Sequence, residues 1–279
     1  MPLKVSFDSN AWQRVVRPSS FPKDPRHPDF VFLRDASRRG QIAGFISETV
    51  GTLEAVRRDD RGRYFAGSRA KIEFEESDEG DGRIHVLVSM GPDHSKHPGL
   101  AGVLSDSLQD AFDLGFRLLA APRLGIPRPP EFLGSDGALR ADLFVDEAPD
   151  CEKNQRLDVF NETATAIEER GVGRAIALGI SNTIKARVGG TPRPWFAYLD
   201  QPNSSAEKTA IQKAIGEWAD GDAMASHIAH GLDVFCTEDI GKSADNSILD
   251  SANRHWLKSE YGVQFATLSE LAGQLRSKI

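Results

Sequence analysis

The stretch LDVFCTEDIGKS (residues 232–243) decides how the rest of the chain is interpreted. Its apolar run VFC (234–236) predicts a buried strand, and this strand runs directly into Thr237, Glu238 and Asp239. A strand end that presents charge is either leaving the core or holding a ligand there. The positions of the other acidic residues separate these two interpretations.

Strands alternate with helices at both ends of the chain. Such alternation is typical of an α/β fold with an open parallel sheet flanked by helices. Ligands of such sheets bind beyond the carboxyl ends of the strands. The predicted strands are residues 3–7, 41–46, 233–236 and 262–267, and the predicted helices are residues 30–39, 47–58, 204–218, 222–230 and 268–277.

The middle of the chain has a different character. Residues 71–76 and 83–90 predict a β-hairpin whose acidic turn is 77–82. We therefore divide the chain into an α/β domain, formed by residues 1–60 plus 205–279, and a mostly helical insertion at 61–204 that carries the hairpin. Helices of the insertion are predicted near residues 104–119, 151–169 and 173–185.

Composition excludes some classes of protein. With 279 residues and a net charge of −7, the chain does not bind nucleic acid through overall positive charge, although a nuclease with a local acidic site stays open. Two cysteines cannot form a disulfide framework, and no apolar run approaches the roughly 18 residues of a spanning helix. We expect a cytoplasmic protein that does not enter a membrane.

Acidic residues recur at one edge of the predicted sheet. One acid at a helix start also satisfies free backbone amides, so the repeated placement is the informative feature. Several carboxylates together repel one another unless a cation joins them, and Mg²⁺ or Mn²⁺ suits oxygen ligands. The candidate acids are Asp8, Glu48, Glu54, Asp220, Asp222 and Asp239.

Four segments resemble, in order, those of the PIN-domain nucleases, metal-dependent ribonucleases that include bacterial toxin nucleases. The resemblance covers residues 1–60 and 205–279, and the insertion matches nothing comparable. It implies a PIN-like sheet. The matching segments are VSFDSNAW (5–12), IAGFISETVGTLEAVRR (42–58), DGDAMASHIAHGLDVFCTED (220–239) and YGVQFATLSELA (261–272).

The resemblance assigns roles at two strand ends directly. Asp8 matches the first metal-binding acid, and Asn10 the polar residue that supports it. Asp239 matches the last acid, and Thr237 the hydroxyl residue two positions before it.

The second and third acids each have two candidates. Glu54 lies seven residues after Ser47 and Glu48 one after it; we prefer Glu54, which returns to the Ser47 face of a helix. Asp220 has the family's distance to the following glycine, whereas Asp222 has the local Asp-Ala-Met pattern, and we prefer Asp222. The predicted metal ligands are Asp8, Glu54, Asp222 and Asp239.

The resemblance implies an endoribonuclease that uses Mg²⁺ or Mn²⁺ to hydrolyse phosphodiester bonds, with single-stranded RNA as substrate. It also implies two kinds of partner, an antitoxin-like protein and a second copy of the chain in a homodimer. One alternative is a catalytically silent PIN-like regulatory or scaffold protein. Another is a different metal-dependent phosphohydrolase, although FDSN (7–10) lacks the second aspartate that aspartate-nucleophile phosphatases use as an acid.

Overall fold

The computed structural model describes residues 1–68, 70–78, 84–123, 126–145, 149–189, 193–239, 241 and 247–277. Five parallel strands form the central sheet in the order β5-β2-β1-β6-β7. Helices flank this sheet, so the predicted α/β class is confirmed. The strands are β1 (Leu3–Phe7), β2 (Ile42–Ser47), β5 (Arg117–Leu119), β6 (Val234–Cys236) and β7 (Phe265–Ala266).

Helices pack on both faces of the sheet. One face is covered by α1 (Trp12–Val16), α2 (His27–Arg38), α4 (Gly102–Asp113) and α9 (Leu268–Arg276). The other face is covered by α5 (Asp150–Glu169), α7 (Ser205–Ala229) and α8 (Ser251–Tyr261).

Alternation along β1 explains why both faces are covered. The side chains of Val5 and Phe7 pack on the first face of the sheet. The hydroxyl of Ser6, between them, forms a 2.7 Å hydrogen bond with Nδ1 of His227 in α7, on the second face. Successive strand residues point to opposite faces, so a strand with buried side chains on both sides belongs in the middle of a layered sheet. The carboxyl end of β1 therefore lies at the centre of the sheet edge.

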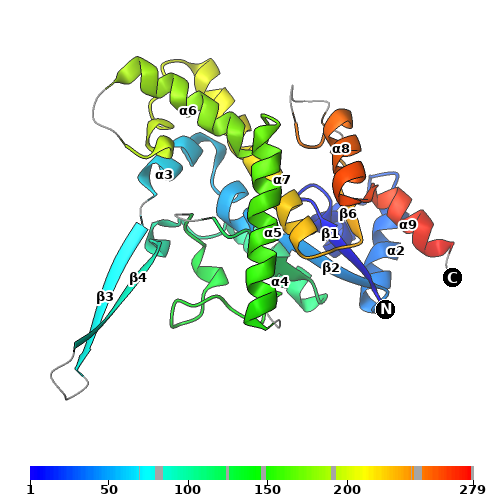
Figure 1. Ribbon diagram of the computed structural model, residues 1–279. Coiled ribbons are helices and arrows are strands. Elements are labelled where there is room, and N and C mark those ends of the chain that lie inside the picture. The colour runs from blue at the N-terminus through cyan, green and yellow to red at the C-terminus, as the bar shows by residue number, and fades with distance from the viewer. Residues whose placement is uncertain are drawn as a thin grey trace.

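The remaining elements lie mostly within residues 61–204. The antiparallel hairpin of β3 (Ala70–Asp78) and β4 (Ile84–Pro92) projects from the body of the molecule (Figure 1). Its predicted turn at 77–82 lies outside the described residues from 79 onward. The other helices are α3 (Arg61–Gly67) and α6 (Arg174–Val188), and the short helical turns are η1 (Pro18–Ser20), η2 (Val50–Glu54), η3 (Arg58–Asp60), η4 (His94–Lys96), η5 (Pro130–Phe132) and η6 (Trp195–Tyr198).

The two helices predicted at 204–218 and 222–230 are one continuous helix, α7, so that prediction was wrong. Gly221 lies inside this helix, where it allows close packing. A Cβ at this position would lie 3.1 Å from the Cα of Gly173 and 3.5 Å from the side chain of Ile167. Asp220 and Asp222 are consequently interior residues of α7 rather than residues at a helix start.

The helix predicted at 47–58 is present only in part, because this segment forms the short π-helix η2 followed by the 3-10 helix η3. β-branched residues and glycine are weak helix formers, and Thr49 to Thr52 contain both. Gly51 also lets the ring of Phe132 approach, since a Cβ there would lie 2.5 Å from that ring.

Three further elements differ from the prediction. The helix predicted near 104–119 ends at Asp113, and its last residues form β5, the outer strand beside β2. Neither α1 nor α8 was predicted. None of the helices in the described part of the chain is long and apolar enough to cross a membrane.

A glycine in β2 provides a test of the sheet packing. Gly44 lies against the buried ring of Phe116, and a Cβ would come within 2.4 Å of that ring. We expect Gly44→Ala to lower the free energy of unfolding by about 2 kcal/mol, because overpacking a core forces its neighbours apart. Urea denaturation measures the change. Gly102→Ala, with nothing within 4 Å, is the matched control, and equal stability of both variants would contradict the packing described here.

Candidate functional site

Asp8 follows β1 and is the most firmly held acid at the sheet edge. Its Oδ1 accepts a hydrogen bond from the Ser9 amide at 2.7 Å, and its Oδ2 accepts from Asn10 Nδ2 at 2.9 Å and Thr237 Oγ1 at 2.6 Å. The side chain is buried, and this burial raises the pKa of Asp8, with a smaller upward contribution from Asp239 and opposition from the three hydrogen bonds.

The end of β6 is joined to the end of β1 by the same hydrogen bonds. Thr237 Oγ1 donates to Asp8 and also accepts from the Asp239 amide at 3.0 Å. Asn10 Oδ1 accepts from the Glu238 amide at 3.0 Å. The structure therefore brings together four predicted residues from the two ends of the chain: Asp8, Asn10, Thr237 and Asp239.

Glu54, at the end of η2, lies near this cluster. Burial, together with the negative charge of Asp8, raises the pKa of Glu54 to about 7 against the opposing effects of Arg61 and Ser9. Since an electrostatic contribution of this kind falls with distance, Glu54 and Asp8 are neighbours. The structure places Glu54, rather than Glu48, beside the first acid.

Asp220, from the middle of α7, completes the acidic group. Burial raises the pKa of Asp220 well above its ordinary value, and Asp8, Glu54, Glu217 and Asp239 each raise it further. Within the described chain no hydrogen bond reaches the Asp220 carboxylate. We call Asp8, Glu54, Asp220 and Asp239 the acidic cluster.

Asp222 does not belong to the acidic cluster, contrary to our preference for it. Its buried carboxylate forms a bidentate ion pair with Arg123, with Nη2–Oδ1 at 2.6 Å and Nε–Oδ2 at 3.0 Å, and accepts from Trp218 Nε1 at 2.9 Å. Two residues along a helix turn the side chain by about 200°. Asp220 and Asp222 therefore face opposite sides of α7.

Glu48 is likewise committed elsewhere. Arg128 donates to it through Nε at 2.6 Å and Nη2 at 3.0 Å, and the Ala121 amide donates at 2.6 Å. With 1% of its side chain exposed, Glu48 is a buried ion-pair partner that joins the end of β2 to the segment after β5.

Sequence reasoning missed two arginines that hold the backbone around the acidic cluster. Arg61 donates to the carbonyls of Glu54 at 3.0 Å and Val56 at 3.1 Å, which fixes the end of η2. Arg254 of α8 donates to the Asp239 carbonyl and to the Leu249 carbonyl at 2.8 Å. Neither has a sequence signal, because each acts on backbone atoms of a segment brought close only by folding.

Glu217, one turn before Asp220, is the other residue that the sequence did not single out. Its pKa is raised mainly by burial, with contributions from Asp239 and Asp250. Its buried Oε2 has no hydrogen-bond partner in the described structure. Glu217 thus adds a further acidic group beside the cluster.

The acidic cluster fits a hard divalent cation in the chemistry of its donors. All four members offer carboxylate oxygens, the ligands that Mg²⁺ and Mn²⁺ prefer. Burial raises the pKa values of Glu54 and Asp220, their mutual repulsion raises them further, and a bound cation would relieve that repulsion. As the side chains of the described residues stand, no three His, Cys, Asp or Glu groups are close enough together to hold one ion.

Comparisons with protein-family models, with curated proteins and with solved structures found no match for this chain.

Removing the Thr237 hydroxyl tests its role in orienting Asp8. We expect Thr237→Val to lower the free energy of unfolding by about 1–2 kcal/mol, because a buried carboxylate loses a donor and the Asp239 amide loses an acceptor. Thermal unfolding measures this, and Thr237→Ser, which keeps the hydroxyl, is the control. An unchanged stability of Thr237→Val, or a larger loss in Thr237→Ser than in Thr237→Val, would show that the hydroxyl does not stabilise the site.

Proposed function

We propose that this chain is a PIN-like, metal-dependent nuclease that hydrolyses phosphodiester bonds of single-stranded RNA at the acidic cluster. The observation that carries the proposal is that four carboxylates from distant parts of the sequence lie at one strand edge, where burial and neighbouring negative charges raise the pKa values of Asp8, Glu54 and Asp220. Acids that only complete a fold are paired with cations, as Asp222 and Glu48 are. Within the described residues no member of the acidic cluster forms a salt bridge, although the charges of Arg61 and Arg254 act on it, and this favours a function over a structural role.

Asp8, Asp220 and Asp239 would hold Mg²⁺ or Mn²⁺, with Glu54 completing the set. A divalent cation there would lower the pKa of a bound water and stabilise negative charge on a phosphate. The substrate class follows the sequence resemblance to ribonucleases. The first strand lies in the middle of the sheet, and this is compatible with such a site at its carboxyl end.

The protein's own groups have separable tasks in this proposal. Thr237 and Asn10 fix the Asp8 carboxylate, so that it presents its remaining lone pairs in one direction. Glu54, with a pKa of about 7, gains or loses a proton at neutral pH and so suits the acceptance of a proton from water. Arg254 places a positive charge next to Asp239, where it can attract a phosphate.

Asp8→Asn tests the proposal. We expect the variant to lose Mn²⁺-dependent cleavage of a single-stranded RNA oligonucleotide while keeping its circular dichroism spectrum, because the amide keeps the shape but not the charge. The wild-type protein with EDTA should likewise fail to cleave the oligonucleotide. Asp106→Asn, an exposed acid on α4, is the matched control and should cleave normally. Full cleavage by Asp8→Asn would rule out the acidic cluster as the catalytic site.

The alternative of a silent scaffold predicts a different result. A scaffold needs no cation at these acids, so calorimetric titration with Mn²⁺ would show no heat that depends on Asp8. The nuclease proposal predicts that this heat is present in the wild type and absent from the variant.

A further inference from the structure

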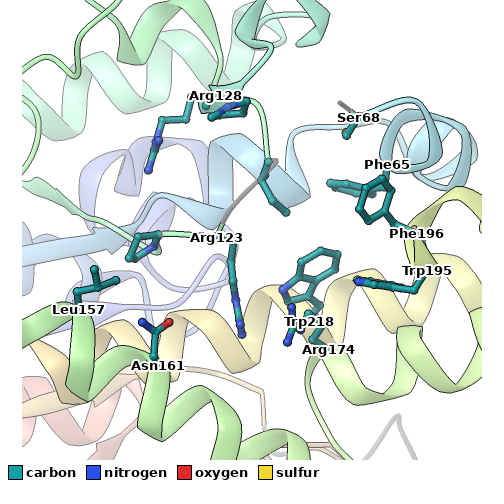
Figure 2. A pocket seen from close by; sticks show the side chains of 14 residues that line it. Phe65, Ser68, Arg123, Arg128, Leu157, Asn161, Arg174, Trp195, Phe196 and Trp218 are labelled. Carbon is teal, nitrogen blue, oxygen red and sulfur yellow. The ribbon is translucent and has the colours of Figure 1, made fainter. Parts of the chain in front are cut away.

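A cavity of about 510 Å³ opens on the opposite side of α7 from the acidic cluster. It lies among α3, the end of β4, α5, α6 and η6, all within or beside the long insertion (Figure 2). Its volume is in the range of pockets that bind small molecules. Trp218 lines it, whereas Asp220, about 200° around the helix, belongs to the acidic cluster.

Aromatic rings form one wall of this pocket. The ring centroid of Trp218 lies 5.6 Å from that of Trp195 and 5.7 Å from that of Phe65. Phe196 packs edge-to-face on Trp195 at 5.9 Å. Trp195 and Phe196 are half-buried, so part of each ring remains accessible from the pocket. Such a wall can stack on another planar ring.

Three arginines line the pocket opposite and beside the rings, and each is held by a carboxylate. Arg123 binds Asp222, Arg128 binds Glu48, and Arg174 binds Glu168. Each uses its Nε and Nη2 atoms for these bonds. The hydrogen bonds of the described residues leave the Nη1 groups of all three without an acceptor.

The charges of this wall cancel. Three guanidinium groups face three carboxylates that do not line the pocket themselves. A phosphate would therefore meet no excess positive charge, whereas a neutral ring with carbonyl or ring-nitrogen acceptors would meet oriented N–H donors at no electrostatic cost. The arrangement favours a planar heterocycle over an anion.

We propose that this pocket binds a nucleobase, stacked on Trp195 and Trp218 and hydrogen-bonded by the arginine Nη1 groups. The base belongs either to a free nucleoside or to a nucleotide of single-stranded RNA. The proposal does not depend on the nuclease activity, because the pocket and the acidic cluster lie on different sides of α7.

Equilibrium dialysis with labelled adenosine and guanosine tests this site. It is done in the Asp8→Asn background with EDTA, so that cleavage and metal binding play no part. We expect saturable retention that changes less than twofold between low and high salt, since the site is charge-balanced. Trp195→Ala should weaken binding about tenfold, and Trp195→Phe should restore most of it. Ribose 5-phosphate, which lacks a base, should not compete.

Trp256→Ala is the matched control, because Trp256 is likewise a half-buried tryptophan but lies on α8 outside the pocket, where it stacks on Arg170 at 4.5 Å. The Trp256→Ala variant should bind nucleosides with the same affinity as the Asp8→Asn protein from which it is made. A single-stranded oligonucleotide that competes identifies RNA as a source of the base, and one that fails to compete identifies the free nucleoside. Absence of nucleoside binding at millimolar concentration, unchanged binding in Trp195→Ala, or competition by ribose 5-phosphate would each overturn the proposal.

Discussion

Asp220→Asn is expected to lower the rate of metal-dependent RNA cleavage by more than about 100-fold. Loss of a group that only supports a metal ligand lowers activity by up to about 100-fold, and loss of a ligand itself should lower it more. Asp220 is the acid of α7 whose pKa is raised, beyond the effect of burial, by the negative charges of Asp8, Glu54 and Asp239. Replacing its carboxylate by an amide removes one of the negative charges that would hold the cation. The measurement is initial cleavage rate at saturating Mn²⁺, compared with the wild type.

Asp222→Asn, two residues away on the same helix, is the matched control. It should keep its cleavage rate at low temperature but lose about 3 kcal/mol of stability, because it breaks the buried ion pair with Arg123. Chemical denaturation measures that loss. The reverse pattern, with cleavage lost at 222 and kept at 220, would contradict the assignment of the third acid and restore our sequence-based preference.

Glu54→Gln is expected to stabilise the metal-free protein at alkaline pH, by up to about 3 kcal/mol at pH 8. A carboxyl whose pKa rises from 4.5 to about 7 on folding favours the folded state only while it is protonated. Between these two values the unfolded chain binds fewer protons than the folded one. Stability of the wild type therefore falls as pH rises from about 4.5 to about 7, and the neutral amide removes this loss.

The difference between wild type and variant separates the acidic cluster around Glu54 from titrating groups elsewhere in the chain. His227 and His230, whose pKa values burial lowers to about 4, make stability rise with pH from about 4 to 6.5, but they do so equally in both proteins. Urea denaturation at pH 5, 6.5 and 8 measures the difference. An equal difference in stability between the two proteins at all three pH values would show that Glu54 is not destabilised by its surroundings. Excess Mn²⁺ should reduce the difference in stability at pH 8, because it stabilises the wild type.

Sequence reasoning located the parts of the site that depend on strand ends. Asp8 and Thr237 each follow a buried strand directly, and parallel strands that are neighbours bring their carboxyl ends together. The hydrogen bond between them joins residues 229 positions apart. That contact follows from the alternation of strands and helices together with the pairing of β1 and β6.

The choice between Asp220 and Asp222 could not be made in the same way. Both acids were predicted to stand at the start of a helix, and a helix start would have presented either of them to the sheet edge. In the fold, Gly221 instead admits the backbone of Gly173, so the helix continues and the two acids face opposite sides. This contact comes from the insertion, whose position relative to α7 has no local sequence signal.

In the middle of the chain, the sequence predicts whether a segment is helix or strand better than it predicts where the segment begins and ends. The hairpin and the helices α5 and α6 follow from local patterns. Strand β5 does not follow from a local pattern. Its three residues, Arg117–Leu119, continue an apolar helical pattern, and pairing with β2 makes them extended. Arg61 and Arg254 act through backbone carbonyls, which a sequence pattern cannot specify.

Calorimetric titration of the metal-free protein with Mn²⁺ tests most directly whether the acidic cluster is one cation site. If it is one site, binding is saturable in the wild type and in Asp222→Asn. Binding is lost in both Asp8→Asn and Asp220→Asn, since these two carboxylates come from distant parts of the chain and contribute to the same site. No binding by the wild type, or binding that survives both of the latter substitutions, would contradict it.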